Sequence, residues 1–197
     1  MIYKSNPLKG ITERFFKGKY GREKEQFADI VLDEDLSEDY VVSNYGRVFC
    51  LNDNRELTYH CLPNRDKYKV VDLKCNGKIG HRCCKSVNVL VANAFVPKTK
   101  RDIELNRTRV HVLDWNQGNS RYSNLVWVNG LDVNVYTMMR DDNSEKNLVK
   151  CICLMLSAGY TSADMKKILG VPVKRSLINS IKSGKIFPEI TSKYKFK

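Results

Sequence analysis

The sequence predicts an α+β protein with a small antiparallel β module, a strand–loop–strand–helix region and three C-terminal helices. Short β-branched and aromatic runs alternate with Asn and Gly turns in the first half of the chain. Two apolar runs then flank a long polar loop, and apolar residues recur at helical spacing near the C-terminus. The expected regions are a basic arm (1–25), the β module (26–85), the strand–helix region (86–140) and the C-terminal helices (145–190).

Four β-prone runs in the module are expected to be strands: residues 40–43, 46–51, 68–73 and 82–87. Turn-forming Asn, Asp and Gly residues separate them, which is typical of an antiparallel sheet. Apolar residues at helical spacing then predict a helix from Val87 to Phe95, which ends before Pro97. A loop rich in Lys, Arg and Asp is expected to follow.

Val110 to Leu113 and Leu125 to Val128 are expected to form two further strands. The polar segment between them, Asp114 to Asn124, is long for a hairpin loop and is therefore a candidate functional segment. A short helix is expected after Asn129, followed by a polar linker from Arg140 to Ser144.

The C-terminal third contains three predicted amphipathic helices. The first ends at Gly159, and the second opens with a capping box made by Thr161 and Asp164 and ends at Gly170. The third is expected to open at Pro172 and to end at Gly184. Their expected inward residues are Leu148, Ile152, Met155, Leu156, Met165, Ile168, Leu169, Leu177, Ile178 and Ile181.

A helix, a turn containing Gly and a basic third helix are typical of a helix-turn-helix DNA-binding region. The side chains expected to face outward, and so to reach a major groove, are Lys174, Arg175, Ser176, Asn179, Ser180 and Lys182. Two alternatives stay open: the basic face is simply solvated, or the helices dock on the central part of the protein.

The chain has 34 Lys and Arg against 22 Asp and Glu, a net charge of +12. Such an excess favours a polyanionic partner, and double-stranded DNA is the simplest one. The cations gather at the two ends of the chain. The arm, with Arg22 and Lys24, and the β module, with Arg47, are expected to contact DNA mainly through phosphates and the minor groove. For residues 1–24, a solvated tail is the alternative.

Integral membrane function is excluded, because the longest apolar stretches fall far short of the roughly 20 residues that a membrane span requires. The N-terminal residues have no apolar segment typical of a secretory signal, so a cytoplasmic location is expected.

The seven cysteines form no C-x-x-C pair. The nearest approach to a zinc cluster is Cys75, His81, Cys83 and Cys84. Because adjacent strand residues face opposite sides, free thiols are expected there rather than structural zinc. His60 beside Cys61 and His81 near Cys83 lack an identifiable oxyanion site, so thiol catalysis is not predicted.

Five segments together resemble the HNH homing endonucleases of phages and introns. FADI (27–30) and YVVSNYGRV (40–48) match the W-x-x-I and Y-x-V-S-N-Y-G-R-V pattern of their modular domain. VNVLVANAFVP (87–97) resembles V-H-R-L-V-A-x-A-F-x-P. VHVLDWNQ (110–117) and NLVWV (124–128) resemble V-N-H-I-D-G-N-K and N-L-E-W-V. The resemblance implies an HNH-like ββα core followed by a C-terminal DNA-binding helix-turn-helix.

In that family, a His on the first strand is the general base, an Asn on the second strand orients it, and a helix residue binds a divalent metal. Aligned without gaps, the general-base position is Val112, the metal position is Val133, and only the orienting Asn124 is retained. Trp115 also replaces the Gly of the motif. The resemblance therefore implies a nuclease that has lost its catalytic groups but kept its apolar frame, Leu113, Leu125, Trp127 and Val128.

The sequence thus predicts a sequence-specific DNA-binding protein without a cofactor, which represses transcription or blocks a competing nuclease in a bacterial cell carrying a phage or mobile element. The enzyme alternative is a Mg²⁺-dependent nicking endonuclease that uses His111 and Asn124, with Asn134 as metal ligand. A strand slip of one residue turns a side chain to the opposite face, so this alternative needs two coincident shifts. A third alternative is an interaction protein that binds another protein.

Overall fold

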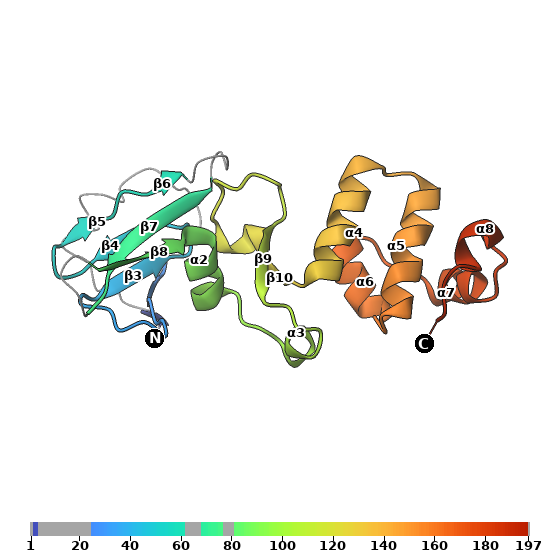
Figure 1. Ribbon diagram of the computed structural model, residues 1–197, viewed down its shortest axis with the longest axis horizontal. Helices are drawn as coiled ribbons and strands as arrows, with labels where there is room; N and C mark the ends of the chain where they lie inside the picture. The colour runs from blue at the N-terminus through green and yellow to red at the C-terminus, as the bar shows by residue number, and fades with distance from the viewer. Residues whose placement is uncertain (1, 4–24, 62–67, 77–80, 197) are drawn as a thin grey trace. The chain divides into compact units, whose positions relative to one another are not determined.

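The computed structural model describes residues 2–3, 25–61, 68–76 and 81–196, and it confirms the α+β class (Figure 1). The chain forms two compact units, Met1–Trp127 and Val128–Lys197. The first contains the sheets and the second is helical. The division of the chain into four regions, which the sequence analysis expected, stays a prediction. The boundary between the two compact units falls within the last strand of the chain.

Two antiparallel sheets and one strand pair make up the first unit. The five-stranded sheet consists, in order, of β1 (Ile2–Tyr3), β2 (Phe27–Asp29), β3 (Tyr40–Ser43), β4 (Val48–Cys50) and β5 (Arg55–Glu56). The three-stranded sheet contains β6 (His60–Cys61), β7 (Lys69–Lys74) and β8 (Arg82–Ser86). The pair is β9 (Arg109–Val112) with β10 (Leu125–Val128).

The four predicted module strands are confirmed as β3, β4, β7 and β8, within two residues at each end. The expectation that the N-terminus is an arm is wrong for residues 2–3, because β1 pairs with β2 at the edge of the sheet. The remaining arm residues, including the predicted DNA contacts Arg22 and Lys24, lie outside the described residues.

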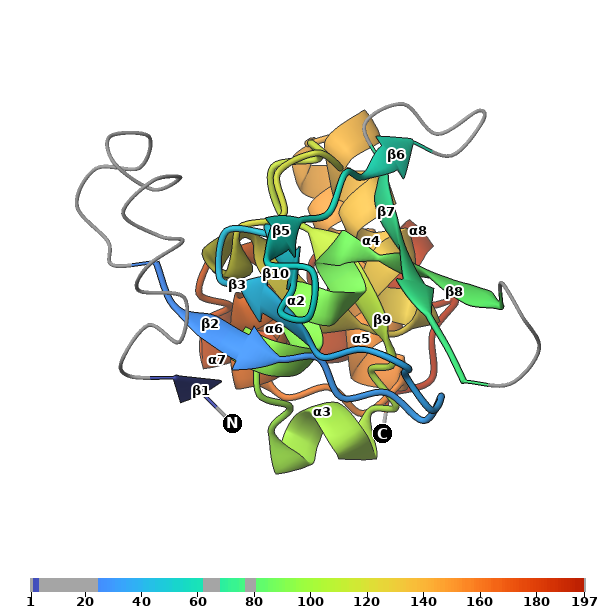
Figure 2. The ribbon, with the colours of Figure 1, turned by 90° about the vertical axis from the view of Figure 1, so that its left-hand side faces the viewer.

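One buried core joins the module to the strand pair. Helix α2 (Val87–Phe95), which has the predicted bounds, packs against β3, β7, β8 and β9 (Figure 2). The core includes Val42 and Leu73 from the sheets and Val112 and Trp127 from the strand pair. The indole Nε1 of Trp127 donates a hydrogen bond to the carbonyl oxygen of Val96 over 2.7 Å. The β-rich segment and the first part of the HNH-like region therefore share one hydrophobic interior.

The loop expected after Pro97 is wrong in part, because it contains the helix α3 (Lys100–Glu104). Thr99 and Asp102 form a capping box at its start. Asp102 also forms an ion pair with Arg107 over 2.8 Å, and the two side chains are 2% and 1% exposed. A five-residue helix is too short to show a periodic apolar stripe, so hydrophobic spacing does not predict it, and the capping box marks where it begins.

The second unit contains α4 (Gly130–Asp141), α5 (Glu145–Ser157), α6 (Ser162–Leu169), α7 (Arg175–Lys182) and α8 (Pro188–Thr191) (Figure 1). Helix α4 packs against α5 and α6, and α7 and α8 pack against α5. The capping box of Thr161 and Asp164 is confirmed, and Gly159 and Gly170 have the positive φ expected after a helix.

Three details of the helical prediction need correction. Helix α4 continues through Asp141, so the polar linker is shorter than expected. Helix α7 begins at Arg175 rather than at Pro172, because its N-cap residue Lys174 has an extended backbone conformation, with φ −67° and ψ 144°. Helix α8 was not predicted; its four residues begin at Pro188 after Phe187 in a left-handed conformation.

All seven cysteines are free thiols. Cys83 and Cys84 face opposite sides of β8, since Cys83 packs against the core and Cys84 is exposed. None of the helices in the described part of the chain has the length and apolarity needed to cross a bilayer.

A polar network around Glu38 ties the two larger sheets together. The carboxylate pairs with the ammonium of Lys74 and accepts hydrogen bonds from the Tyr40 hydroxyl over 2.6 Å and the Cys50 thiol over 3.2 Å. The hydrogen bond from Lys74, followed by the one from Tyr40, lowers the pKa of Glu38 from 4.5 to about 2.

Because the folded-state pKa is depressed, the network stabilises the protein above pH 4.5, and this contribution is lost as the pH falls through about 2. We expect Glu38→Gln to lower the free energy of unfolding at pH 7 by about 1 kcal/mol, since the Lys74 partner is partly screened by solvent. The variant should also lose part of the acid dependence of stability. Urea unfolding from pH 7 to pH 2.5 measures both effects. The control Glu104→Gln, on the exposed surface, should shift the curve by less than about 0.5 kcal/mol, and an identical pH profile for Glu38→Gln would contradict the prediction.

Candidate nucleic-acid interface and HNH-like centre

The predicted order of strand, loop, strand and helix is present along the chain as β9, the Asp114 to Asn124 loop, β10 and α4. Val112 is 1% exposed and belongs to the apolar core. Leu113 is 46% exposed, so its expected place in the apolar frame is wrong, whereas Leu125 and Trp127 are buried as predicted. The motif residues Val112, Leu125 and Trp127 on the two strands therefore pack in the apolar core.

Asn124 is held inside the loop by its own amide group. Its Oδ1 accepts a hydrogen bond from the backbone N–H of Asp114 over 3.1 Å. Its Nδ2 donates to Asp114 Oδ1 over 2.9 Å and to the carbonyl oxygen of Asn119 over 3.0 Å. Since an amide offers one acceptor oxygen and two donor hydrogens, these bonds use its donors fully. Asn124 therefore fixes the loop.

Asp114 is the centre of the same loop. Besides Asn124, it accepts hydrogen bonds from the Asn119 amide over 2.7 Å and from the backbone N–H of Asn116 over 2.9 Å. The bonds from Asn119 and Asn124 are the main cause of a pKa below the usual range for an aspartate. The loop predicted to be functional is therefore an ordered structure built on one carboxylate.

Trp115 occupies the position where the family motif has Gly, and its φ is positive, at 61°. Its ring meets the imidazole of His111 edge to face, with centroids 4.7 Å apart. The indole is 39% exposed and lies outside the apolar core. A large side chain now covers the histidine that the enzyme alternative requires.

His111 is 8% exposed, and burial lowers the pKa of its imidazole. Strand alternation places it on the opposite face from Val112. The other groups of the alternative site come from α4, where Asn134 is exposed and Val133 is half-buried. Valine has no lone pair for a proton or a cation, and the Asn124 amide is engaged in the loop. The residues at the family's positions therefore do not fit a divalent metal.

The SNYG segment of the module positions this loop. The backbone carbonyl of Asn44 accepts a hydrogen bond from the N–H of Tyr122 over 2.9 Å. The Arg121 guanidinium lies 5.1 Å from the centre of the Tyr45 ring. Gly46 has φ at +83°, and a Cβ there would lie 2.4 Å from the Cβ of Ser120. The SNYG segment, which belongs to the most specific motif of the sequence, thus forms the contact between the sheet and the loop.

Arg47 makes several internal contacts. Its guanidinium forms two bonds to the Glu56 carboxylate, over 3.1 and 2.6 Å, and lies 3.5 Å from a Glu25 oxygen. It also lies 5.1 Å from the centre of the Phe49 ring, and its side chain is 14% exposed. Its predicted contact with DNA stays a prediction, and the geometry gives Arg47 a structural role.

The predicted outward face of α7 is exposed at Lys174, Arg175, Ser176, Asn179 and Lys182, while Ser180 is half-buried. On the inner side Ile181 is fully buried, and Leu177 and Ile178 are half-buried. Between residues 165 and 188 the chain carries no acidic residue. All six cations of that stretch are exposed: Lys166, Lys167, Lys174, Arg175, Lys182 and Lys185.

A pocket of about 610 Å³, which no sequence pattern indicated, lies in the first unit. Its lining comes from β7, α2, β9 and the loop: Tyr68, Asn88, Val89, Thr108, Arg109, Val110 and Gln117. Asn88, only 4% exposed, donates from Nδ2 to the carbonyl oxygen of Gln117 over 3.3 Å. These residues are far apart in the chain, so only the fold brings them together.

No family model and no curated protein matches this sequence. Among solved structures, the chain is similar to the HNH homing endonuclease I-HmuI, from a study of DNA binding and cleavage by that enzyme. The two share 20% identity over 80% of this chain and 90% of the other, with a TM-score of 0.44. At this level of similarity, the function has to be argued from the residues of the chain itself.

Proposed function

We propose that this protein binds double-stranded DNA in a sequence-specific manner, does not cleave it, and acts by occupying its target. The role would be that of a repressor or of a protein that blocks another nuclease at the site. Such a protein would work in the cytoplasm of a bacterial cell that carries a phage or mobile element.

The observation that carries DNA binding is the exposed cationic surface of α6 and α7. Six exposed cations and no acidic residue lie between residues 165 and 188. They are on or beside a helix–turn–helix arrangement in which Gly170 supplies the positive φ of the turn. In helix-turn-helix proteins, the helix that follows the turn enters the major groove. In this arrangement that helix is α7.

Salt dependence tests this part of the proposal. If all six cations neutralise phosphates, log Kobs should fall with log salt concentration with a slope of about −5. Fluorescence anisotropy with a labelled duplex, from low to moderate salt, measures the slope. A slope near zero would exclude the DNA role and favour the alternative of a protein-binding module.

The absence of cleavage is supported by the geometry around Val112. This residue is buried in the core at the position of the general base, and Asn124 is used to hold the loop. His111 is covered by Trp115 and belongs to the neighbouring strand position. The valines at the general-base and metal-ligand positions, Val112 and Val133, have no lone pair for a proton or a cation.

We expect the purified protein to leave supercoiled plasmid and its selected target intact in the presence of Mg²⁺ or Mn²⁺. Gel electrophoresis of the plasmid forms measures nicking, with a mock purification as the control for contaminating nuclease. Nicking that is absent from the mock preparation and lost in both His111→Ala and Asn134→Ala would overturn the proposal in favour of the Mg²⁺-dependent endonuclease.

A further inference from the structure

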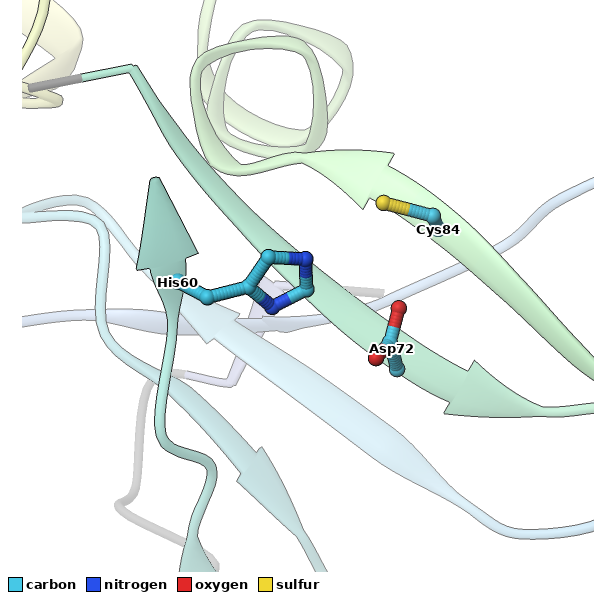
Figure 3. Close-up of side chains that lie close together, drawn as sticks. All are labelled: His60, Asp72 and Cys84. Atoms are coloured by element: carbon cyan, nitrogen blue, oxygen red, sulfur yellow. The ribbon is translucent and has the colours of Figure 1, made fainter. Parts of the chain in front are cut away.

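Three potential metal ligands from three strands meet on the exposed face of the β6–β7–β8 sheet. Asp72 on β7 lies directly opposite Cys84 on β8. His60 on β6 is paired with Val70, which lies two residues before Asp72 and so has the same orientation. Figure 3 shows the imidazole, the carboxylate and the thiol turned toward one another. The possible ligand atoms all lie within 4.8 Å of one another.

The three side chains are accessible to an ion from solution. Each is exposed, on the side of the sheet opposite to the core residues Val71 and Leu73. The Cys84 sulfur and an Asp72 carboxylate oxygen lie within 4.8 Å of each other, on the same face of the sheet. A cation that replaces the thiol proton would be bound by a thiolate, a carboxylate and an imidazole nitrogen.

The donor set selects the class of metal. One nitrogen, one oxygen and one sulfur suit Zn²⁺ and other late first-row cations, whereas Mg²⁺ and Ca²⁺ prefer oxygen ligands alone. In a tetrahedral zinc site, donors about 2.0–2.3 Å from the ion lie roughly 3.5 Å from one another. Side-chain rotations that move the ligand atoms by about 1 Å would reach this geometry. Three protein ligands leave the fourth position of the tetrahedron for water.

We propose that His60, Asp72 and Cys84 form a binding site for one Zn²⁺ ion. Binding releases the proton of the Cys84 thiol, and the ion links β6, β7 and β8. Among the described residues, β6 pairs with β7 at two positions and β8 pairs with β7 at five, so β6 is the strand that gains most from the link. The site uses none of the residues at the HNH-like positions.

Other clusters of the module fit an ion less well. The four residues suggested by the sequence cannot act together, because Cys83 packs against the core while Cys84 is exposed on the other face. A second group, Glu38, Cys50 and Asp53, also has its ligand atoms within 4.8 Å of one another. There the ammonium of Lys74 already neutralises Glu38, and Cys50 is fully buried.

Cobalt titration of the full-length, metal-stripped and reduced protein tests the site directly. Co²⁺ should produce a sulfur-to-cobalt charge-transfer band that saturates at one equivalent, and Zn²⁺ should abolish it while excess Mg²⁺ should not. Cys84→Ser should remove the band, and His60→Gln and Asp72→Asn should each weaken binding by about 10-fold to 100-fold. The matched controls Cys61→Ser and His81→Gln, exposed neighbours of the site, should bind like the wild type.

A second measurement needs no variant. At a Zn²⁺ concentration ten times the Kd, alkylation of Cys84 by iodoacetamide should slow by about tenfold, while that of Cys61 should hardly change. At a hundred times the Kd, the melting temperature should rise by roughly 5–10 °C. A band that persists in Cys84→Ser, or equal alkylation of Cys84 with and without Zn²⁺, would overturn the proposal.

Discussion

Gly46→Ala is expected to lower the free energy of unfolding by about 2–4 kcal/mol, since it combines an unfavourable backbone conformation with a steric clash. The residue has φ at +83°, and an added Cβ would lie 2.4 Å from Ser120 Cβ and 3.2 Å from Val87 Cγ1. Neither neighbour is the end of a flexible chain, so the loop after Asp114 would have to move. Urea denaturation monitored by tryptophan fluorescence measures the loss, because Trp127 belongs to the same buried core as Val87.

Two matched variants separate the clash from the backbone cost. Gly170→Ala has φ at +70° but no heavy atom within 4 Å of the new Cβ, so it should cost only about 1 kcal/mol. Ser120→Gly removes the nearest atom, so Gly46→Ala should cost less in that background than alone. Equal costs in the two backgrounds would show that the contact with Ser120 does not determine the requirement for glycine.

Arg175→Ala and Asn179→Ala are expected to lower the preference for the selected target over random DNA by roughly 5-fold to 150-fold, since a good base contact contributes about 1–3 kcal/mol of discrimination. The two residues are one helical turn apart on α7, and both are exposed. Arginine and asparagine can make bidentate contacts with the edges of guanine and adenine, respectively. Target selection from a random DNA pool, followed by competition binding at fixed salt, measures the effect.

Lys182→Ala provides the comparison for this experiment. It lies at the end of α7, where a phosphate contact is expected, so its loss should weaken target and random DNA by similar factors. An unchanged melting transition confirms that each variant is folded. If the Arg175 and Asn179 double variant keeps its full target preference, recognition lies elsewhere, and the loop between Asp114 and Asn124 would be the next candidate.

The elements that were predicted correctly are those specified by nearby residues. The spacing of Val87, Leu90, Val91 and Ala94 predicts α2 with its observed bounds. Thr161, Asp164 and Gly170 specify the two ends of α6 through local hydrogen bonds and a positive φ. The amphipathic pattern of α7 also predicts its exposed residues, because a helix separates its faces within two turns.

The sequence by itself determined the α+β class, the succession of strands and helices, the cationic surface of α6 and α7, and the valine at the general-base position. Tertiary structure alone decided the burial of the Asp102–Arg107 pair, the confinement of Asn124 within its loop, and the meeting of His60, Asp72 and Cys84. The physical reason is the range of the interactions. Periodicity, capping and charge act within a few residues. The burial of the Asp102–Arg107 pair depends on packing against other elements, and the loop and strand contacts join residues ten or more positions apart that no local pattern connects.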